Sequence, residues 1–178
     1  MKKSASVEPR VYAACLSAYT NGKLHGEWID CSNTTVDAIQ DQIDAMLAKS
    51  PEPDAEEWAI HDYEGFGGYK VGEHEDLDDL VELADLLTEH GEVAVAAIEN
   101  EVHVERIKLL CEHGFMGEYR SKEEWAEEYL VDTGSLPDNR LVRDYFNYKA
   151  FARDCEIGGD VQFVEVGYNK VLVFDGHI

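Results

Sequence analysis

A histidine next to a carboxylate is the first combination in this sequence of 178 residues that could do chemistry. His61 and Asp62 lie at the end of a segment expected to be a strand, where the pair could act as a general base. A histidine that only forms a hydrogen bond near a turn is the commoner interpretation. Two other pairs of metal-ligand types, at 103–105 and 111–113, are too small to complete a zinc site. We therefore expect a protein without catalytic residues or metal; a hydrolase is an alternative that a His61→Ala variant would test.

A glycine-rich segment, Gly65-Phe66-Gly67-Gly68, superficially resembles a nucleotide-binding loop. It lacks the G-x-G-x-x-G spacing that lets a backbone approach a pyrophosphate at a helix N-terminus. Its neighbours are acidic and would repel phosphate groups. The sequence therefore predicts a turn at this position and no nucleotide cofactor.

Carboxylates are the dominant chemical groups of this chain. Asp and Glu number 38 against 15 Lys and Arg, which gives a formal net charge of −23. A catalytic carboxyl group needs apolar burial to shift its pKa, whereas most of these groups are expected to face solvent. Such a surface repels nucleic acid and membranes and attracts basic surfaces. We therefore expect a protein partner that is basic, and no nucleic-acid or membrane partner.

The acidic residues are concentrated in one part of the chain. The stretch VGEHEDLDDLVELADLLTEHGE at 71–92 holds nine carboxylates and no Lys or Arg. Its leucines recur at helical spacing, so Leu77, Leu80, Leu83 and Leu87 fall in one broad arc and most carboxylates in the other. Leu86 is expected on the acidic side. The pattern predicts a folded helix with one solvated acidic face, ending at His90-Gly91.

The elements that must hold this helix can be predicted from the same patterns. Strands are expected at 11–17, 26–31 and 58–63, with Asn21-Gly22 forming a hairpin turn between the first two. Thr34 or Thr35 can cap a helix that runs to about Ala48. Two further helices are expected at 92–105 and 106–113.

The residue pattern of the C-terminal part predicts two more helices and a hairpin. Ser121 and Glu124 form a capping box at the start of one helix. A second helix is expected at 138–154, where four basic residues slightly outnumber three acidic ones and apolar side chains surround most of the circumference. Such a helix is either central in a core or shared with a partner chain. A hairpin is expected from 161–166 to 170–174.

Composition excludes several classes of protein. The hydrophobic content of 44% argues against disorder. The sequence contains no run of 18 apolar residues, so we expect no membrane span. The two lysines near the start precede no apolar segment, so we expect no secretory signal and a cytoplasmic location. The four cysteines are far apart, which favours free thiols.

The amount of charge is sufficient to imitate a nucleic acid backbone. Duplex DNA carries about one charge per 1.7 Å of axis, so the 23 net charges match about 39 Å of duplex. Carboxylates three or four residues apart on a helix lie about 5–6 Å from each other. A solvated face that only aids solubility is the simpler alternative. Halophilic adaptation would predict acidic residues spread over the whole chain, which this sequence does not show.

Several longer motifs, in their order and number, resemble the ArdA-type antirestriction proteins of conjugative plasmids and transposons, over residues 11 to 174. The motifs that carry the resemblance are YTNGKLHGEW at 19–28, WAIHDYEGF at 58–66, GEY at 117–119, WAEE at 125–128, TGSLP at 133–137 and YFNYKAFARD at 145–154. The chain departs from the family pattern in residues 1–10 and in 93–97. The antirestriction motif of the family would fall around 127–141, at or near the dimer contact.

The resemblance implies an elongated α+β chain of three small domains that forms a homodimer, mimics bent B-form DNA and has no catalytic residues. Its partner would be a Type I restriction-modification enzyme of the bacterial host cell, in the DNA-binding groove of the methyltransferase core. On this chain the expected domains are an N-terminal antiparallel sheet plus helix at 1–72, an acidic helical middle at 73–113 and a C-terminal α+β domain with the hairpin and the dimer contact at 114–178.

These arguments select two sets of residues. The expected partner-binding acidic surface consists of Glu73, Glu75, Asp76, Asp78, Asp79, Glu82, Asp85, Glu89, Glu92, Glu123, Glu124, Glu127 and Glu128. The expected dimer contact consists of Tyr129, Leu136, Tyr145, Tyr148 and Phe151. The alternative function is an acidic adaptor that binds another basic or DNA-binding protein, and competition with duplex DNA for a Type I methyltransferase would separate the two.

Overall fold

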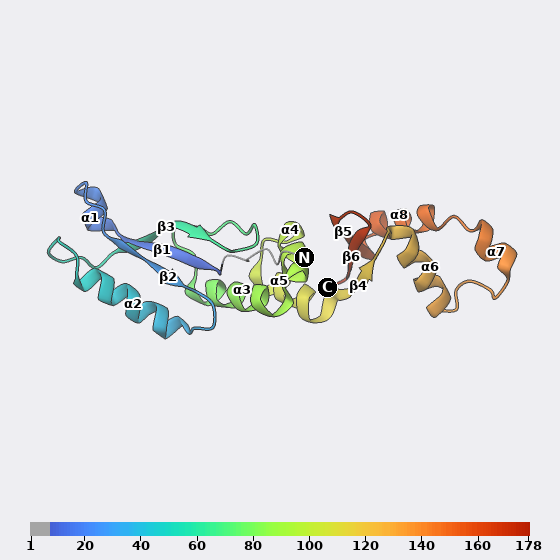
Figure 1. Ribbon diagram of the computed structural model, residues 1–178, viewed down its shortest axis with the longest axis horizontal. Coiled ribbons are helices and arrows are strands. Elements are labelled where there is room, and N and C mark those ends of the chain that lie inside the picture. Colours follow the sequence, from blue (N-terminus) through green and yellow to red (C-terminus); the bar gives the residue numbers. More distant parts are fainter. Residues whose placement is uncertain (1–7) are drawn as a thin grey trace. The chain divides into compact units, whose positions relative to one another are not determined.

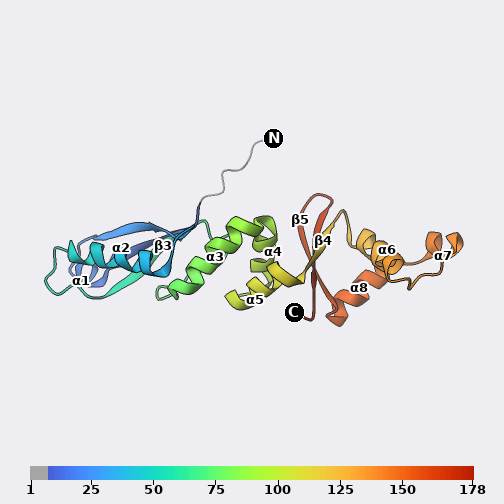
Figure 2. The ribbon, with the colours of Figure 1, turned by 90° about the horizontal axis from the view of Figure 1, so that it is seen from below.

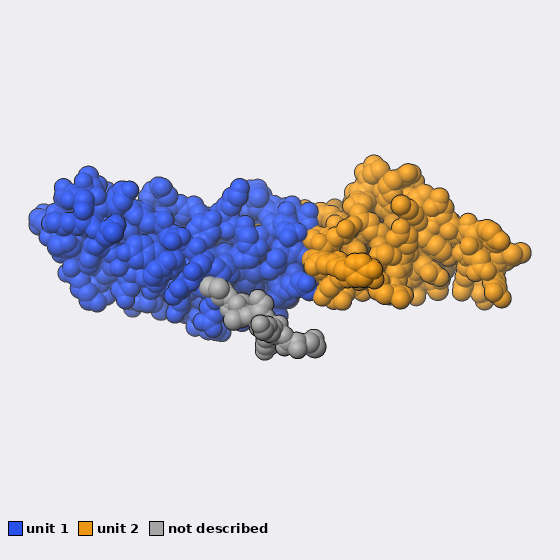
Figure 3. All heavy atoms as spheres, turned by 45° about the horizontal axis from the view of Figure 1, so that its top comes forward, with its two compact units in different colours: residues 1–104 blue, residues 105–178 orange. Residues whose placement is uncertain are grey.

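The computed structural model describes residues 8–178 and divides the chain into two compact units, Met1–Val104 and Glu105–Ile178 (Figure 3). Each unit holds one small three-stranded antiparallel sheet with helices (Figure 1), which confirms the α+β class. The division into three domains, at 72 and 113, stays a prediction. The expected absence of a secretory signal falls mainly on residues 1–7, outside the described residues.

Unit 1 begins with a sheet and continues with helices. Its elements in chain order are β1 (Arg10–Cys15), α1 (Leu16–Thr20), β2 (Gly26–Asp30), α2 (Val36–Ala48), β3 (Trp58–Glu64), α3 (Leu77–His90), α4 (Glu92–Asn100) and the start of α5 (Val104–Leu109). The strand order is β2-β1-β3. Helix α2 covers one face of this sheet (Figure 2) and buries Ile39, Ile43 and Met46. Thr35 caps the helix by accepting a hydrogen bond from the Ala38 N–H, as predicted.

The connection between the first two strands differs from the predicted two-residue turn. Strands β1 and β2 do pair antiparallel, but the short helix α1 follows β1 directly. Asn21 ends this helix at a φ of −88°, and Gly22 alone of the two takes a positive φ, +75°. Ala18 is buried, so one turn of helix buries apolar surface that a tight hairpin would leave exposed.

Unit 2 packs two helices against the second sheet. Its elements after α5 are the π-helix η1 (Leu110–Gly114), β4 (Phe115–Tyr119), α6 (Lys122–Asp132), α7 (Arg140–Tyr145), α8 (Tyr148–Gly158), β5 (Val161–Gly167) and β6 (Lys170–Asp175). The strand order is β4-β6-β5, so the predicted hairpin of β5 and β6 is confirmed. Strand β4 was not predicted, since its short sequence FMGEY carries no alternation and includes a glycine at a φ of +149°. Trp125 lies at the centre of the core, with Val161, Val171 and Val173.

The single helix predicted at 138–154 is wrong. Phe146 is extended, with φ −70° and ψ +139°, and separates α7 from α8. The Asn147 side chain accepts a hydrogen bond from the Ala150 N–H and so starts a new helix. The apolar residues expected on one helix thus belong to two separate helices.

Candidate partner-binding surface

The neighbouring residues His61 and Asp62 each make a separate local contact. His61 is exposed and its ring contacts the ring of Tyr19 edge-on, with centroids 4.6 Å apart. The Asp62 carboxylate accepts a hydrogen bond from the Tyr63 N–H at 2.8 Å, a local contact that needs no histidine. The geometry therefore supports the structural interpretation of this pair.

The metal-ligand pairs also stay isolated. His113 lies 3.7 Å from the Glu112 carboxylate, and both side chains are exposed. Cys111 is buried, and this burial together with Glu112 raises the pKa of its thiol to about 11. Within residues 8–178 no three metal-ligating side chains come together.

Gly67 has a packing role beyond the predicted turn. Its φ is +61°, and a Cβ atom there would lie 2.8 Å from Leu87 Cδ2 and 3.2 Å from Val95 Cγ2. The loop after β3 therefore passes close against α3 and α4. The absence of a side chain at Gly67 allows this close approach.

Helix α3 carries the densest part of the candidate surface. Leu80, Leu83, Ala84 and Leu86 are buried in it. The expected position of Leu86 on the acidic side is wrong, because α3 packs against both α2 and α4 and its buried arc is wider than a single contact requires. The carboxylates nearest this arc are consequently half-buried, and the exposed acidic face is narrower than the sequence suggests.

Three of the expected carboxylates on this helix form an exposed stripe. Asp78, Asp85 and Glu89 are all exposed. They are spaced by seven and four residues, so they follow one side of α3 over about 16 Å at 1.5 Å per residue. Helix α6 adds Glu127 and Glu128, which are also exposed. We call Asp78, Asp85 and Glu89 of α3 the carboxylate stripe.

Other members of the expected surface have structural roles. Asp76 caps α3 by accepting a hydrogen bond from the Asp78 N–H, and Glu75 accepts from the Gly72 N–H and the Tyr69 hydroxyl. The Glu124 carboxylate accepts hydrogen bonds from the backbone N–H and the side chain of Arg120. The predicted capping box, in which Glu124 would accept from the Ser121 N–H, is therefore not complete. Ser121 itself caps α6 as expected.

The remaining expected carboxylates have mixed surroundings. Asp79, Glu82 and Glu92 also interact with other residues, and Asp79 and Glu82 are half-buried. Glu73 is exposed, whereas Glu123 is half-buried at the edge of a cavity. The idea that the carboxylates of 71–92 stay unpaired is thus wrong for several of them, which do structural work within the unit.

The acidic surface acts on the tyrosines next to it. Burial and the nearby charges of Glu75 and Asp79 raise the pKa of Tyr69 to about 12. In unit 2, burial and the charges of Glu128 and Asp132 raise the pKa of Tyr119. Burial is the larger cause of both shifts, and the neighbouring carboxylate charges add to it in each unit.

The expected dimer residues are divided between core and surface. Leu136 is only 6% exposed. Tyr148 and Phe151 pack on the core of unit 2, and the Tyr148 hydroxyl donates a hydrogen bond to the Arg143 carbonyl oxygen. Tyr129 is partly exposed and stacks on Trp125, whereas the Tyr145 side chain is 85% exposed.

Sequence reasoning missed the exposure of Leu141 and a cavity lined by residues of three segments. Leu141 is 69% exposed on α7, a helix that buries none of its residues. The cavity gathers basic residues from three segments that are far apart in the chain. The apolar spacing within 140–146 could have indicated the first, but no local pattern indicates the second.

The fold and this surface define an acidic α+β protein whose exposed chemistry is dominated by carboxylates. No helix within residues 8–178 is both long and apolar enough to cross a membrane. A family model described as Antirestriction protein (ArdA) matches residues 11–170 of the 178. The chain therefore belongs to the ArdA family of antirestriction proteins, which are inhibitors. No curated protein matches the chain significantly.

Proposed function

We propose that this protein inhibits Type I restriction-modification enzymes in the bacterial cytoplasm by occupying the DNA-binding groove of their methyltransferase core. The observation that carries this proposal is the carboxylate stripe of Asp78, Asp85 and Glu89, exposed on a helix that is anchored in its unit by four buried residues. A rigid row of anions can meet the lysines and arginines that would otherwise bind phosphates. Membership of an antirestriction family supports this choice of partner.

The charge density shows that the stripe cannot act alone. About 16 Å of duplex carries roughly nine charges, whereas the stripe supplies three carboxylates over that length. Binding must therefore be distributed over other acidic residues, including Glu127 and Glu128 on α6. The net charge of −23, equivalent to about 39 Å of duplex, supplies enough charge for this.

This mechanism needs neither a reaction nor a DNA sequence. Phosphate contacts position a protein on DNA but carry no base information, so an imitation of the backbone can compete at any recognition site. Association of the acidic and basic surfaces would release counterions from both. Affinity should therefore fall steeply with salt, as it does for DNA itself.

We further propose that the protein acts as a homodimer that uses α7. This six-residue helix exposes Leu141 and Tyr145 and buries none of its own residues. Isolated short helices are marginal in water, so a partner surface would stabilise this one. The region is also close to neutral in charge, and two copies of an acidic protein should meet where their repulsion is smallest.

Competition with DNA tests the proposed function directly. A purified Type I methyltransferase would be bound to a labelled duplex that holds its recognition site, and the protein would be added at about 50 and 200 mM salt. We expect displacement of the duplex at both salt concentrations and a weaker effect at the higher one. If the protein binds the enzyme without displacing DNA, the adaptor function is supported, and if it does not bind, the proposal is wrong.

A further inference from the structure

A cavity in unit 2 combines aromatic rings with carboxylates. Its volume is about 380 Å³, within the size range of small-molecule sites, and all its lining residues belong to unit 2. Trp125, Tyr129 and Phe151 supply the rings, and Asp160 and Asp175 supply the carboxylates. Among residues 8–178, no lysine or arginine lines it. The lining therefore offers an apolar wall and uncompensated negative charge to one ligand.

Two packed helices position the aromatic wall. Trp125 and Tyr129 lie one turn apart on α6, and Phe151 extends from α8, which packs against α6. The planes of the three rings differ by only 17° to 27°, and the centroids of Trp125 and Tyr129 are 5.2 Å apart. Trp125 is 2% exposed and Tyr129 is 39% exposed, so this wall extends from the core to the surface.

The two carboxylates come together at one end of the second sheet. Asp160 precedes β5, and Asp175 is the register partner of Val161 in the β5–β6 pair. His177 contacts both: its Nε2 lies 3.5 Å from the Asp160 carboxylate, and its backbone N–H donates a hydrogen bond to Asp175 at 2.8 Å. Neither carboxylate pairs with a lysine or arginine in the part of the chain that the structure describes. Counted with a neutral histidine, as in the net charge of the chain, the lining carries two negative charges.

The charge of Asp160 is felt inside the cavity. The thiol of Cys155 also lines it, and burial is the main cause that raises the pKa of this thiol. The charges of Asp160 and Asp154 add to the same shift. An anionic ligand would therefore be repelled here, whereas a cation would be attracted.

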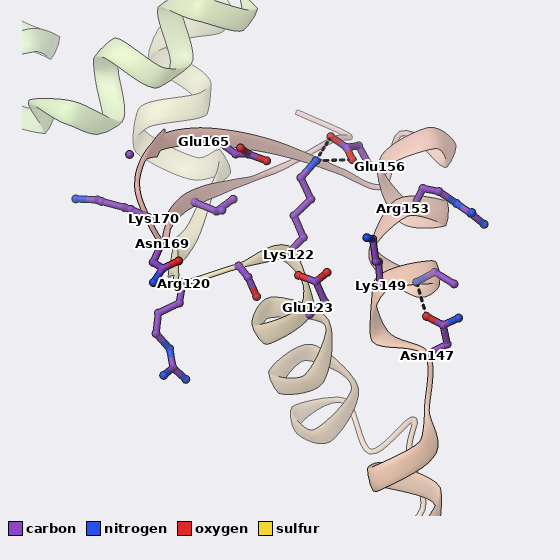
Figure 4. A pocket seen from close by; sticks show the side chains of 14 residues that line it. Arg120, Lys122, Glu123, Asn147, Lys149, Arg153, Glu156, Glu165, Asn169 and Lys170 are labelled. Carbon is purple, nitrogen blue, oxygen red and sulfur yellow. Dashed lines mark hydrogen bonds and ion pairs between the residues drawn. The ribbon is translucent and has the colours of Figure 1, made fainter.

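The larger cavity of unit 2 differs because its charges are already compensated. Lys122 Nζ lies 2.8 Å from the Glu156 carboxylate (Figure 4), and Arg120 pairs with Glu124. The ends of the Arg120 and Lys170 side chains also point apart in Figure 4. Uncompensated charge of one sign is thus a property of the smaller cavity.

Unit 1 shows which cation this combination of groups holds. The guanidinium carbon of Arg10 lies 4.8 Å from the centroid of the Trp28 ring, and the same guanidinium pairs with the Glu64 carboxylate. An aromatic ring and a carboxylate thus already bind an arginine side chain elsewhere in this chain. The cavity of unit 2 presents the same two kinds of group without a cation of its own.

Arginine suits such a cavity better than lysine does. Its guanidinium is planar and weakly hydrated, stacks on aromatic rings and binds carboxylates through two parallel hydrogen bonds. Its methylene stem can lie along an apolar wall. We propose that this cavity receives an arginine side chain from the basic surface of the partner enzyme. The choice of partner rests on the proposed function, and no residue of α7 lines the cavity, so the proposed dimer contact uses other side chains.

A nuclear magnetic resonance titration of the full chain with Nα-acetylarginine amide tests the cavity without any restriction enzyme. We expect the indole N–H signal of Trp125 to shift saturably and that of Trp58, in unit 1, to stay fixed. Nα-acetylcitrulline amide has the same shape without the charge and should cause little shift. An absent or unsaturable Trp125 shift would overturn the site, and an equal response to the citrulline compound would overturn the role of the carboxylates. Tighter binding of Nα-acetyllysine amide would overturn the choice of arginine.

A charge-removing variant and a matched control locate the binding. Asp160→Asn with Asp175→Asn keeps an acceptor for the His177 N–H and should weaken binding of the arginine compound between about 2-fold and about 30-fold, the value of two exposed ion pairs. Asp138→Asn with Glu165→Gln removes two exposed carboxylates of unit 2 that do not line this cavity, and should change binding little. An equal loss in the control would overturn the site, because only net charge would then matter. The citrulline comparison decides the same point on the parent chain and needs no variant.

Displacement of duplex DNA from a Type I methyltransferase tests the partner. The variant Asp160→Asn, Asp175→Asn should displace DNA less well than the control variant at the same salt concentration. Equal displacement by both would overturn the enzyme as the source of the arginine. A Trp125 signal that moves with protein concentration alone would make a second copy of this chain the occupant, which also overturns it. A parent chain that displaces no DNA would refute the proposed function, whereas the arginine titration decides the cavity separately.

Discussion

Neutralising the carboxylate stripe should weaken binding to a Type I enzyme, and the expected loss of affinity follows from the number of exposed charges removed. The variant Asp78→Asn, Asp85→Asn, Glu89→Gln removes three exposed charges from α3. An exposed ion pair contributes about 0.2–1 kcal/mol, so three pairs contribute about 0.6–3 kcal/mol together. At 1.4 kcal/mol for each factor of ten, the expected loss of affinity is between about 3-fold and about 150-fold.

The same change on another helix is the matched control. Asp37, Asp41 and Asp44 are exposed on α2, and Asp37 lies in the first helical turn just as Asp78 does. Neutralising these three alters the net charge equally and removes one first-turn carboxylate, as the stripe variant does. We expect this control to change affinity less than the stripe variant does.

The assay is displacement of a labelled duplex from the enzyme at a fixed salt concentration, after circular dichroism has shown that both variants stay folded. Equal losses in both variants would mean that only total charge matters. An unchanged affinity of the stripe variant would refute the role of α3. A stripe variant that unfolds would instead show that these carboxylates stabilise the helix.

Three other predictions concern assembly and stability. The variant Leu141→Ser, Tyr145→Ser should convert a sedimenting dimer into a monomer, because it removes the exposed apolar side chains of α7; a parent that is monomeric at micromolar concentration would refute the dimer. Trp125→Ala should lower the free energy of unfolding of unit 2 by about 3–5 kcal/mol in urea, since Trp125 is 2% exposed, whereas Tyr168→Ala, at a residue 96% exposed, should change it little. The pKa of Glu52 lies below its ordinary value of 4.5 because Lys23 donates a hydrogen bond to its carboxylate. Ionised Glu52 therefore stabilises the fold above pH 4.5, and this stabilisation is lost as the pH falls through the lowered pKa. Glu52→Gln should therefore be less stable than the parent at pH 7 and similar to it near pH 2; an equal difference at both pH values would contradict this linkage.

Local patterns predicted the elements that depend on near neighbours in the chain. The Thr35 and Ser121 caps form as expected because each needs only a backbone N–H three residues away. The helix of 77–90 ends at Gly91, which takes a φ of +53° that few other residues tolerate. The acidic character of the chain and its membership of an antirestriction family also followed from composition and motifs alone.

Elements whose outcome depends on distant contacts were predicted less well. Leu86 lies on the acidic side of a helical wheel, yet it is buried in a helix that packs against α2 and α4. The break at Phe146 is a competition between helix continuation and the cap at Asn147, and side-chain packing on the core of unit 2 favours α8 as a separate helix. Strand β4 forms against β6, more than fifty residues later in the sequence, and its own residues show no strand pattern.

Sequence by itself thus determined the charge of this protein, the positions of most helices and strands and the family. The tertiary structure alone decided which carboxylates are exposed, because a helix face is solvated only where no other element covers it. It also decided that Trp125, Asp160 and Asp175 line one cavity. Side chains on separate segments act together only when the packing of helices and strands brings them within reach of one ligand, and that distance is not written in the spacing of residues along the chain.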